Sequence, residues 1–165
     1  MNIKRILRHL LPPPWLARRA FSPAVMGRIE DAVKQSERLH RGELRVAVEA
    51  SMDLGPLLRK QSPRARACEV FAELGVWDTA GNSGVLLYIN WADRDIEIVA
   101  DRGISAQVRQ EQWEVICRNM EQAFREDRFE AGLLEGIRQL TDLLTQHFPV
   151  VGENPDELGN QPVLL

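Results

Sequence analysis

Residues 84–89 (Gly-Val-Leu-Leu-Tyr-Ile) are apolar at every position rather than at every second one. This pattern is typical of a central strand that has both faces covered. Residues 43–50 instead alternate, which predicts a half-buried strand with Glu43 and Glu49 on its outer side. A helical pattern at 63–75 separates the two strands, and a helical crossover of this kind places them parallel in one sheet.

The remaining patterns complete a small mixed sheet. A turn at 92–95 returns the chain as an antiparallel strand at 96–100, and Ser105 is expected to cap the next helix. Gly132 and Gly136 lie in the last helix and allow a close helix contact. Together these elements predict an α/β fold in which a small mixed sheet is flanked by helices on both faces. Helices are expected at 2–11, 22–39 and 63–75, after Ser105, and at 129–147.

The chain divides into three parts around a single domain. Residues 1–21 combine a basic amphipathic helix with a linker that contains Pro12-Pro13-Pro14. Residues 22–148 carry the alternating helices and strands. Residues 149–165 form a tail that we expect to be loop-like, although it ends in the apolar run Val163-Leu164-Leu165.

The N-terminal helix separates charge from apolar surface. Its apolar stripe consists of Ile3, Ile6, Leu7, Leu10 and Leu11, and its other face of Lys4, Arg5, Arg8 and His9. A short basic amphipathic helix can lie on an anionic membrane or dock on a partner. The alternative is that its apolar stripe covers the core of this protein. The candidate docking residues are Ile3, Lys4, Arg5, Leu7, Arg8 and Leu11.

Charge is distributed unevenly along the chain. Residues 1–28 contain six bases and no acid, which leaves 15 bases against 24 acids in the remainder. An acidic body repels a phosphate backbone, so nucleic-acid binding is not expected. No secretory signal and no bilayer-spanning run is visible. We therefore expect a cytoplasmic protein, peripheral at the inner face of the membrane.

Most catalytic motifs are absent, and oxygen-bearing side chains at the two ends of the sheet remain as candidates. The C-terminal ends of the parallel strands would bring Asp53 near Asp93 and Asp95, at the end where ligands often gather. The opposite end gathers another set, namely Asp78, Asn82, Asp101 and Arg102, together with Glu43 at the start of its strand. Hard cations such as Ca²⁺ or Mg²⁺ take oxygen ligands of this kind, and an arginine can position a phosphate. We favour Asp78, Asn82 and Asp101 as metal ligands and Arg102 as the phosphate-binding residue, with Asp53, Asp93 and Asp95 as the alternative.

Residues 77–104 resemble the TPM domain family of thylakoid-lumen and bacterial proteins, a putative phosphatase family. The resemblance rests on Asn82-Ser83-Gly84, the apolar strand 85–89, the Asp93-Arg94 turn and Asp101-Arg102-Gly103-Ile104. The segment from Phe124 and Phe129 through residues 132–137 is also similar. The resemblance covers residues 22–148 and implies a single TPM-like domain with a mixed sheet between helices.

The resemblance also carries functional implications. Some family members are credited with acid phosphatase activity, and some bind calcium at acidic loops. Bacterial members often occur beside LemA-type membrane proteins and membrane-anchored TPM proteins. This chain departs from the family's usual Gly-aromatic-Gly-Leu-Glu segment and the Asp that follows it, because it has Asp101-Arg102-Gly103-Ile104-Ser105 and then Gln107, Val108 and Arg109. The missing carboxylates weaken the calcium and phosphatase inferences.

Two functions follow from these observations. The first is a TPM-domain accessory protein, a binding module that works with a membrane surface or a LemA-type or TPM membrane protein and has a degenerate divalent-cation site, with Ca²⁺ as the candidate ion. The alternative is a metal-assisted acid phosphatase acting on phosphate monoesters. The missing acids favour the first. The sequence leaves open whether the chain is an enzyme and what its oligomeric state is.

Overall fold

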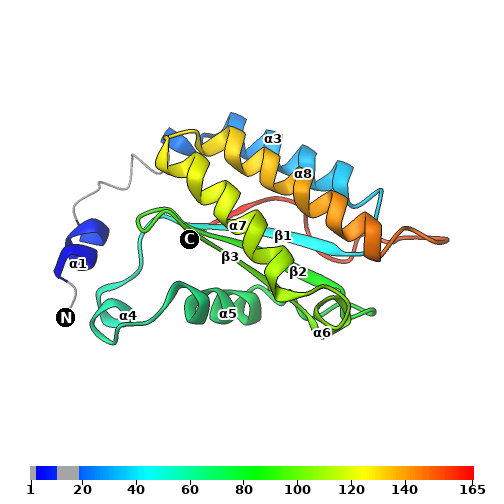
Figure 1. Ribbon diagram of the computed structural model, residues 1–165, viewed down its shortest axis with the longest axis horizontal. Helices are drawn as coiled ribbons and strands as arrows, with labels where there is room; N and C mark the ends of the chain where they lie inside the picture. Colours follow the sequence, from blue (N-terminus) through cyan, green and yellow to red (C-terminus); the bar gives the residue numbers. More distant parts are fainter. Residues whose placement is uncertain (1–2, 11–18) are drawn as a thin grey trace.

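The computed structural model describes residues 3–10 and 19–165, apart from the side chain of residue 3. These residues form seven helices and four strands (Figure 1). The helices are α1 (Ile3–Leu10), α3 (Pro23–Ser36), α4 (Leu54–Leu58), α5 (Pro63–Glu73), α6 (Arg102–Ser105), α7 (Gln110–Arg125) and α8 (Phe129–His147). The strands are β1 (Glu43–Glu49), β2 (Gly84–Asn90), β3 (Asp95–Ala100) and β4 (Val163–Leu164).

The strands form one mixed sheet in the order β3-β2-β1-β4. The predicted pairings are confirmed, because β1 runs parallel to β2 with Glu43 opposite Gly84, and β3 returns antiparallel. The tail is not all loop as expected. It supplies β4, which pairs parallel to β1, and the Leu165 N–H donates to the Val48 carbonyl at 2.8 Å. An apolar chain end next to an unpaired strand edge explains this addition.

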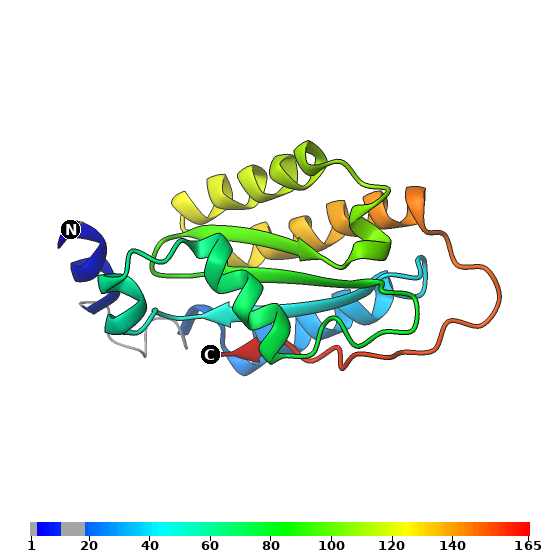
Figure 2. The same ribbon diagram turned by 90° about the horizontal axis from the view of Figure 1, so that it is seen from below.

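Helices cover both faces of the sheet, which confirms the predicted fold class. Helices α3, α7 and α8 lie on one face and α5 on the other (Figures 1 and 2). Every residue of β2 is buried, as its unbroken apolar pattern predicts. The half-buried assignment of β1 is wrong: Glu43 and Glu49 are only 2% and 7% exposed. Helix α5 and the returning tail cover the face that the alternation assigned to solvent.

Helix starts follow the sequence signals in two cases and depart from them in one. The Ser22 and Ser62 side chains accept hydrogen bonds from the Val25 and Ala65 N–H groups, as expected of caps followed by proline. Ser105 is not a cap. It ends the short helix α6, and α7 begins at Gln110, where the Gln112 side chain accepts from the Arg109 N–H at 3.2 Å.

Glycine allows two close approaches in the fold. A Cβ on Gly84 would lie 1.8 Å from the Val76 carbonyl oxygen, so β2 can begin only where that side chain is absent. A Cβ on Gly132 would lie 2.7 Å from the Cβ of Ala123, which confirms the predicted close contact of α8 with α7.

Candidate functional site: a basic helix at one pole of the sheet

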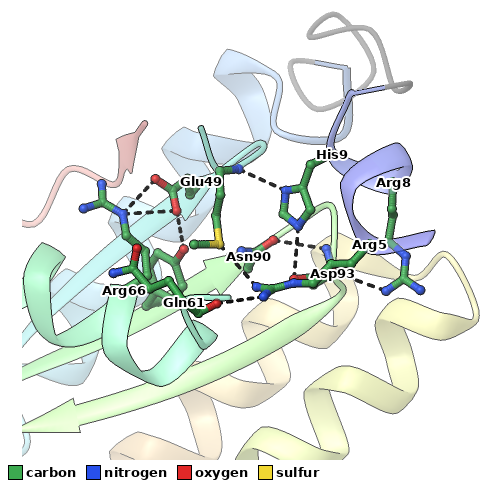
Figure 3. A network of polar contacts seen from close by, with 10 residues as sticks. Arg5, Arg8, His9, Glu49, Gln61, Arg66, Asn90 and Asp93 are labelled. Atoms are coloured by element: carbon green, nitrogen blue, oxygen red, sulfur yellow. Dashed lines mark hydrogen bonds and ion pairs between the residues drawn. The ribbon is translucent and has the colours of Figure 1, made fainter. Parts of the chain in front are cut away.

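Helix α1 is attached to the turn between β2 and β3 by a buried carboxylate. Asp93 lies in that turn with its side chain 8% exposed, and Arg5 donates to it from Nε at 2.7 Å. Arg8 Nη1 lies 3.3 Å from Asp93 Oδ1, and His9 Nε2 lies 3.1 Å from Oδ2. Figure 3 shows the three basic side chains of α1 converging on Asp93. The Asp93 carboxylate thus contacts three basic side chains of α1.

His9 also ties α1 to the chain that follows β1. The imidazole is buried, and its Nδ1 accepts a hydrogen bond from the Met52 N–H at 3.0 Å (Figure 3). Nδ1 is therefore the acceptor and Nε2 carries the proton that faces Asp93. Burial alone would raise the pKa of Asp93, but hydrogen bonds from His9 and Arg5 outweigh it and hold that pKa below its ordinary value. The ionised carboxylate is thus the stable form in this pocket.

Arg5 and His9 of α1 point toward the domain, whereas Leu7 and Leu10 of its apolar face point outward. Leu7 and Leu10 are 46% and 59% exposed, whereas His9 is 4% exposed. The reading in which the apolar stripe covers this protein's own core is wrong for these two leucines. The cause is electrostatic, because a buried Asp93 requires cationic partners and α1 supplies them. Of the other docking candidates, Lys4 and Arg8 are exposed, while Leu11 and the Ile3 side chain lie outside the described residues.

A cavity of about 440 Å³ adjoins α1 at this pole, and arginines dominate its lining. Arg8 comes from α1, Arg94 from the β2–β3 turn and Arg125 from the end of α7. Arg94 pairs with Asp127 at 2.7 Å, and Arg125 with Glu121 at 3.0 Å. Trp91 forms part of the same wall. Asp93, the partner of Arg8, also lines the cavity, which therefore combines three guanidinium groups with one carboxylate.

The other two acids of this pole have separate environments. Asp53 is exposed and begins α4 without a side-chain cap hydrogen bond. Burial, together with repulsion from Glu97 and Glu121, raises the pKa of Asp95 to about 6. Because α1 already supplies the partners of Asp93, a cation binding there would compete with Arg5 and His9.

At the opposite pole, the structure brings Asn82 and Arg102 together. Arg102 Nε donates to Asn82 Oδ1 at 2.9 Å, and the Gly103 N–H donates to the Asn82 carbonyl at 3.0 Å. The Asp101 carboxylate accepts from the Arg102 N–H through Oδ1 at 2.6 Å and so caps α6. Asp78 is exposed in the loop before β2. A cavity of about 360 Å³ adjoins this loop and is lined by Gly81, Gly103 and Arg41, among others.

Sequence reasoning missed a buried polar network on the α5 face. The Tyr88 hydroxyl donates to the Glu49 carboxylate, and Arg66 Nε donates to the same carboxylate at 3.0 Å (Figure 3). Burial and the neighbouring Glu49 raise the pKa of Tyr88 above its ordinary value. A signal was available, because a tyrosine within an unbroken apolar strand requires a polar partner for its hydroxyl. The network fixes α5 on β1 and β2.

Comparison with known proteins identifies a matching family and a similar solved structure. The family model described as "TPM domain" matches residues 17–143. The chain belongs to the TPM domain family. The NMR structure of the BA42 protein from the psychrophilic bacterium Bizionia argentinensis is similar to it, with 27% sequence identity and a TM-score of 0.76. The match covers 87% of this chain and 94% of that one. No curated protein matches the chain.

The basic helix α1 lies outside the segment that the family model matches. Across residues 3–10 and 19–165, no helix combines the length and apolarity needed to cross a bilayer. Residues 3–10, which form α1, precede the matched segment, whereas Asp93 lies inside it. The site at this pole thus joins a residue of the TPM domain to a segment that the family model does not cover.

Proposed function

We propose that this TPM domain is a binding module that docks on an anionic membrane surface through α1. The carrying observation is that Leu7 and Leu10 are exposed while Arg5 and His9 of the same helix face Asp93. A helix that uses its polar face to bind its own domain has its apolar face free to enter a second surface. Its place of action would be the inner face of the membrane.

The exposed basic residues of α1 favour an anionic membrane surface. Lys4 and Arg8 are exposed beside the two leucines, and the first 28 residues contain no acid. Full burial of a leucine side chain stabilises by roughly 1.5–3 kcal/mol, and each base near an anionic leaflet adds about 1 kcal/mol. These contributions favour weak, reversible and salt-sensitive binding rather than permanent anchoring.

The arginine-lined cavity supports the same assignment. Arg8, Arg94 and Arg125 surround a space of about 440 Å³ directly beside α1. A lipid phosphate there would meet guanidinium groups while Leu7 and Leu10 reach the acyl boundary. The apolar and anion-binding parts of the surface would then contact one bilayer together.

Co-sedimentation with vesicles tests the proposal. The full chain, the double variant Leu7→Ser/Leu10→Ser and the control Leu39→Ser are compared on vesicles with about 30% anionic lipid. Leu39 is 54% exposed on a different part of the surface, so its change removes a similar apolar side chain. We expect the double variant to bind about tenfold more weakly or not at all, and the control to bind like the wild type. Binding only to vesicles that carry a LemA-type or TPM membrane protein would identify a protein partner instead.

A metal-assisted acid phosphatase is the second candidate, and one observation favours it. Arg102 is exposed and held by Asn82 next to the cavity that Gly103 and Gly81 line. In this reading Asp78, Asn82 and Asp101 hold the ion, and Arg102 binds the phosphate monoester. Metal-dependent hydrolysis of an aryl phosphate that is lost in Asp101→Asn would support it. Hydrolysis that this substitution leaves unchanged would remove the site.

A further inference from the structure

A second exposed apolar surface lies beside α1, at the same pole of the sheet. Helix α4 packs against α1, and both helices lie at the left-hand end of the molecule in Figures 1 and 2. Leu54 and Leu58 of α4 are 48% and 54% exposed. With Leu7 and Leu10, four exposed leucines thus belong to two adjoining helices that come from distant parts of the sequence.

Helix α4 presents two leucines to solvent while a third holds it on the domain. Leu54 and Leu58 are four positions apart and therefore share one face of the helix. Leu57, between them in the sequence, is only 5% exposed. The helix also contains Gly55 and Pro56, the two poorest helix formers, so helix propensity does not hold this turn in place. Burial of Leu57 anchors it instead, and the two outer leucines are left uncovered.

Helix α1 is bound to both ends of the segment that contains α4. Arg5 Nη1 donates to the carbonyl of Gln61, after α4, at 2.7 Å, and His9 Nδ1 accepts from the Met52 N–H, before α4, at 3.0 Å (Figure 3). The same two basic side chains contact Asp93. The contacts that hold α1 on the domain therefore also fix its position relative to α4.

Exposed basic side chains accompany the leucines of both helices. Arg59 and Lys60 follow α4 directly and are exposed, as are Lys4 and Arg8 of α1. The single acid next to α4 in the sequence is Asp53, at its N-cap. An anionic bilayer offers acyl chains to the leucines and lipid phosphates to the bases. The charge and the apolar surface of α4 thus match the same kind of membrane as those of α1.

We propose that α4 enters an anionic bilayer together with α1, so that Leu54 and Leu58 form the second half of the docking surface. This inference rests on the proposed function of α1 and extends it into the segment that the TPM family model matches. One short helix alone gives only marginal membrane binding. A second inserting element on the same domain strengthens it, because the second element enters at a high effective concentration.

Two inserting elements also orient the domain on the membrane. Helices α1 and α4 lie at one pole of the sheet, whereas α6, next to Asn82, lies at the other (Figure 1). Docking through α1 and α4 therefore turns the pole of Asn82 and Arg102 away from the bilayer. That pole stays accessible to soluble molecules while the domain is bound.

Co-sedimentation of the full chain with vesicles of about 30% anionic lipid tests the role of α4. The variant Leu54→Ser/Leu58→Ser changes two exposed side chains and keeps the buried Leu57, so the fold is retained. We expect it to bind about tenfold more weakly than the wild type. The control Leu39→Ser, at an exposed leucine elsewhere on the surface, should bind like the wild type.

Two further measurements separate insertion from an indirect effect. Arg59→Gln/Lys60→Gln should weaken binding severalfold at low salt and make it less sensitive to salt. Backbone amide NMR on anionic bicelles that carry a paramagnetic headgroup should broaden the signals of residues 7–10 and 54–60. The signals of residues 81–83 and 102–104 should stay sharp, because their pole faces away from the lipid. Broadening at 81–83 and 102–104 instead of at 54–60 would overturn the proposal.

The variants distinguish this inference from the proposed function of α1. Vesicle binding that Leu7→Ser/Leu10→Ser abolishes and Leu54→Ser/Leu58→Ser leaves unchanged would overturn the role of α4 alone. Binding that only the α4 change weakens would support α4 and overturn the role of α1. No binding by the wild type would overturn both, and a dimer that Leu54→Ser/Leu58→Ser dissociates would then assign the surface to a second copy of the chain.

Discussion

His9 Nε2 lies 3.1 Å from Asp93 Oδ2, although the two residues are 84 positions apart in the sequence. This pair, with Arg5 on the same carboxylate, decides which way the first helix faces. An amphipathic helix beside a protein ordinarily buries its apolar side. Here the buried Asp93 draws Arg5 and His9 toward the domain, and Leu7 and Leu10 are left outside.

Removing the charge of Asp93 should release α1. In Asp93→Asn the buried His9 and the partly buried Arg5 lose their anionic partner, at a cost of about 1–3 kcal/mol in the free energy of unfolding. Hydrogen exchange at the Met52 N–H, which donates to His9, should speed up by about tenfold or more. The control Asp53→Asn, an exposed acid at the same pole, should change stability by less than about 0.5 kcal/mol. Equal effects of the two changes would show that Asp93 does not hold the helix.

The stability of the protein should fall as the pH rises toward 8. Burial, then repulsion from Glu43 and Asp156, raises the pKa of Glu37 from 4.5 to about 8 in the folded state. The folded state therefore holds this proton more tightly than the unfolded chain. The stability that this contributes is full below pH 4.5 and is lost as the pH rises through about 8.

The variant Glu37→Gln isolates that contribution. Its Tm, measured between about pH 5 and 8.5, should fall less steeply with pH than that of the wild type. Part of the slope should remain, because burial also raises the pKa values of Glu43 and Asp95. The control Glu153→Gln, which removes an exposed tail carboxylate, should follow the wild-type curve. A slope that Glu37→Gln leaves unchanged would mean that Glu37 titrates normally.

Two glycine substitutions should have opposite effects. In Gly84→Ala the new Cβ would lie 1.8 Å from the Val76 carbonyl oxygen, so the strand or the preceding turn must shift. We expect a loss of about 1–3 kcal/mol in the free energy of unfolding. Gly27→Ala places a Cβ within α3 with nothing within 4 Å, and should stabilise by up to about 1 kcal/mol. Urea unfolding of both variants checks the pair, and similar losses in both would contradict the packing at Gly84.

The fold could largely be predicted from the sequence because it rests on local patterns. The unbroken apolar run of β2 and the Ser-Pro helix starts at Ser22 and Ser62 carry their signals within a few residues. The predictions were wrong where residues that are distant in the sequence determine the local structure. Glu49 alternates like a solvent-facing residue and is buried only because Tyr88 and Arg66 bind it. The strand β4 forms because its partner strand has a free edge, which its own residues do not encode.

In the candidate sites, too, contacts set by local patterns could be predicted and contacts set by distant residues could not. Asn82 and Arg102 meet as the strand order predicts, because neighbouring strand ends bring them together. The docking of Arg5 and His9 on Asp93 was missed, since helical periodicity separates two faces without saying which one turns inward. The sequence placed Glu43 at the same end of the sheet as Asn82, but the approach of Asp156 to Glu43 and Glu37 depends on the path of a tail that carries no strong pattern.

The most direct test of the proposed function is the salt dependence of vesicle binding by the unmodified chain. The dissociation constant is measured on vesicles with about 30% anionic lipid and on neutral vesicles, from about 50 to about 300 mM salt. If α1 docks through Leu7 and Leu10 beside Lys4 and Arg8, binding will require the anionic lipid and weaken at least severalfold as salt increases. Equal binding to neutral vesicles, or no binding to anionic vesicles at the lowest salt, would contradict the account.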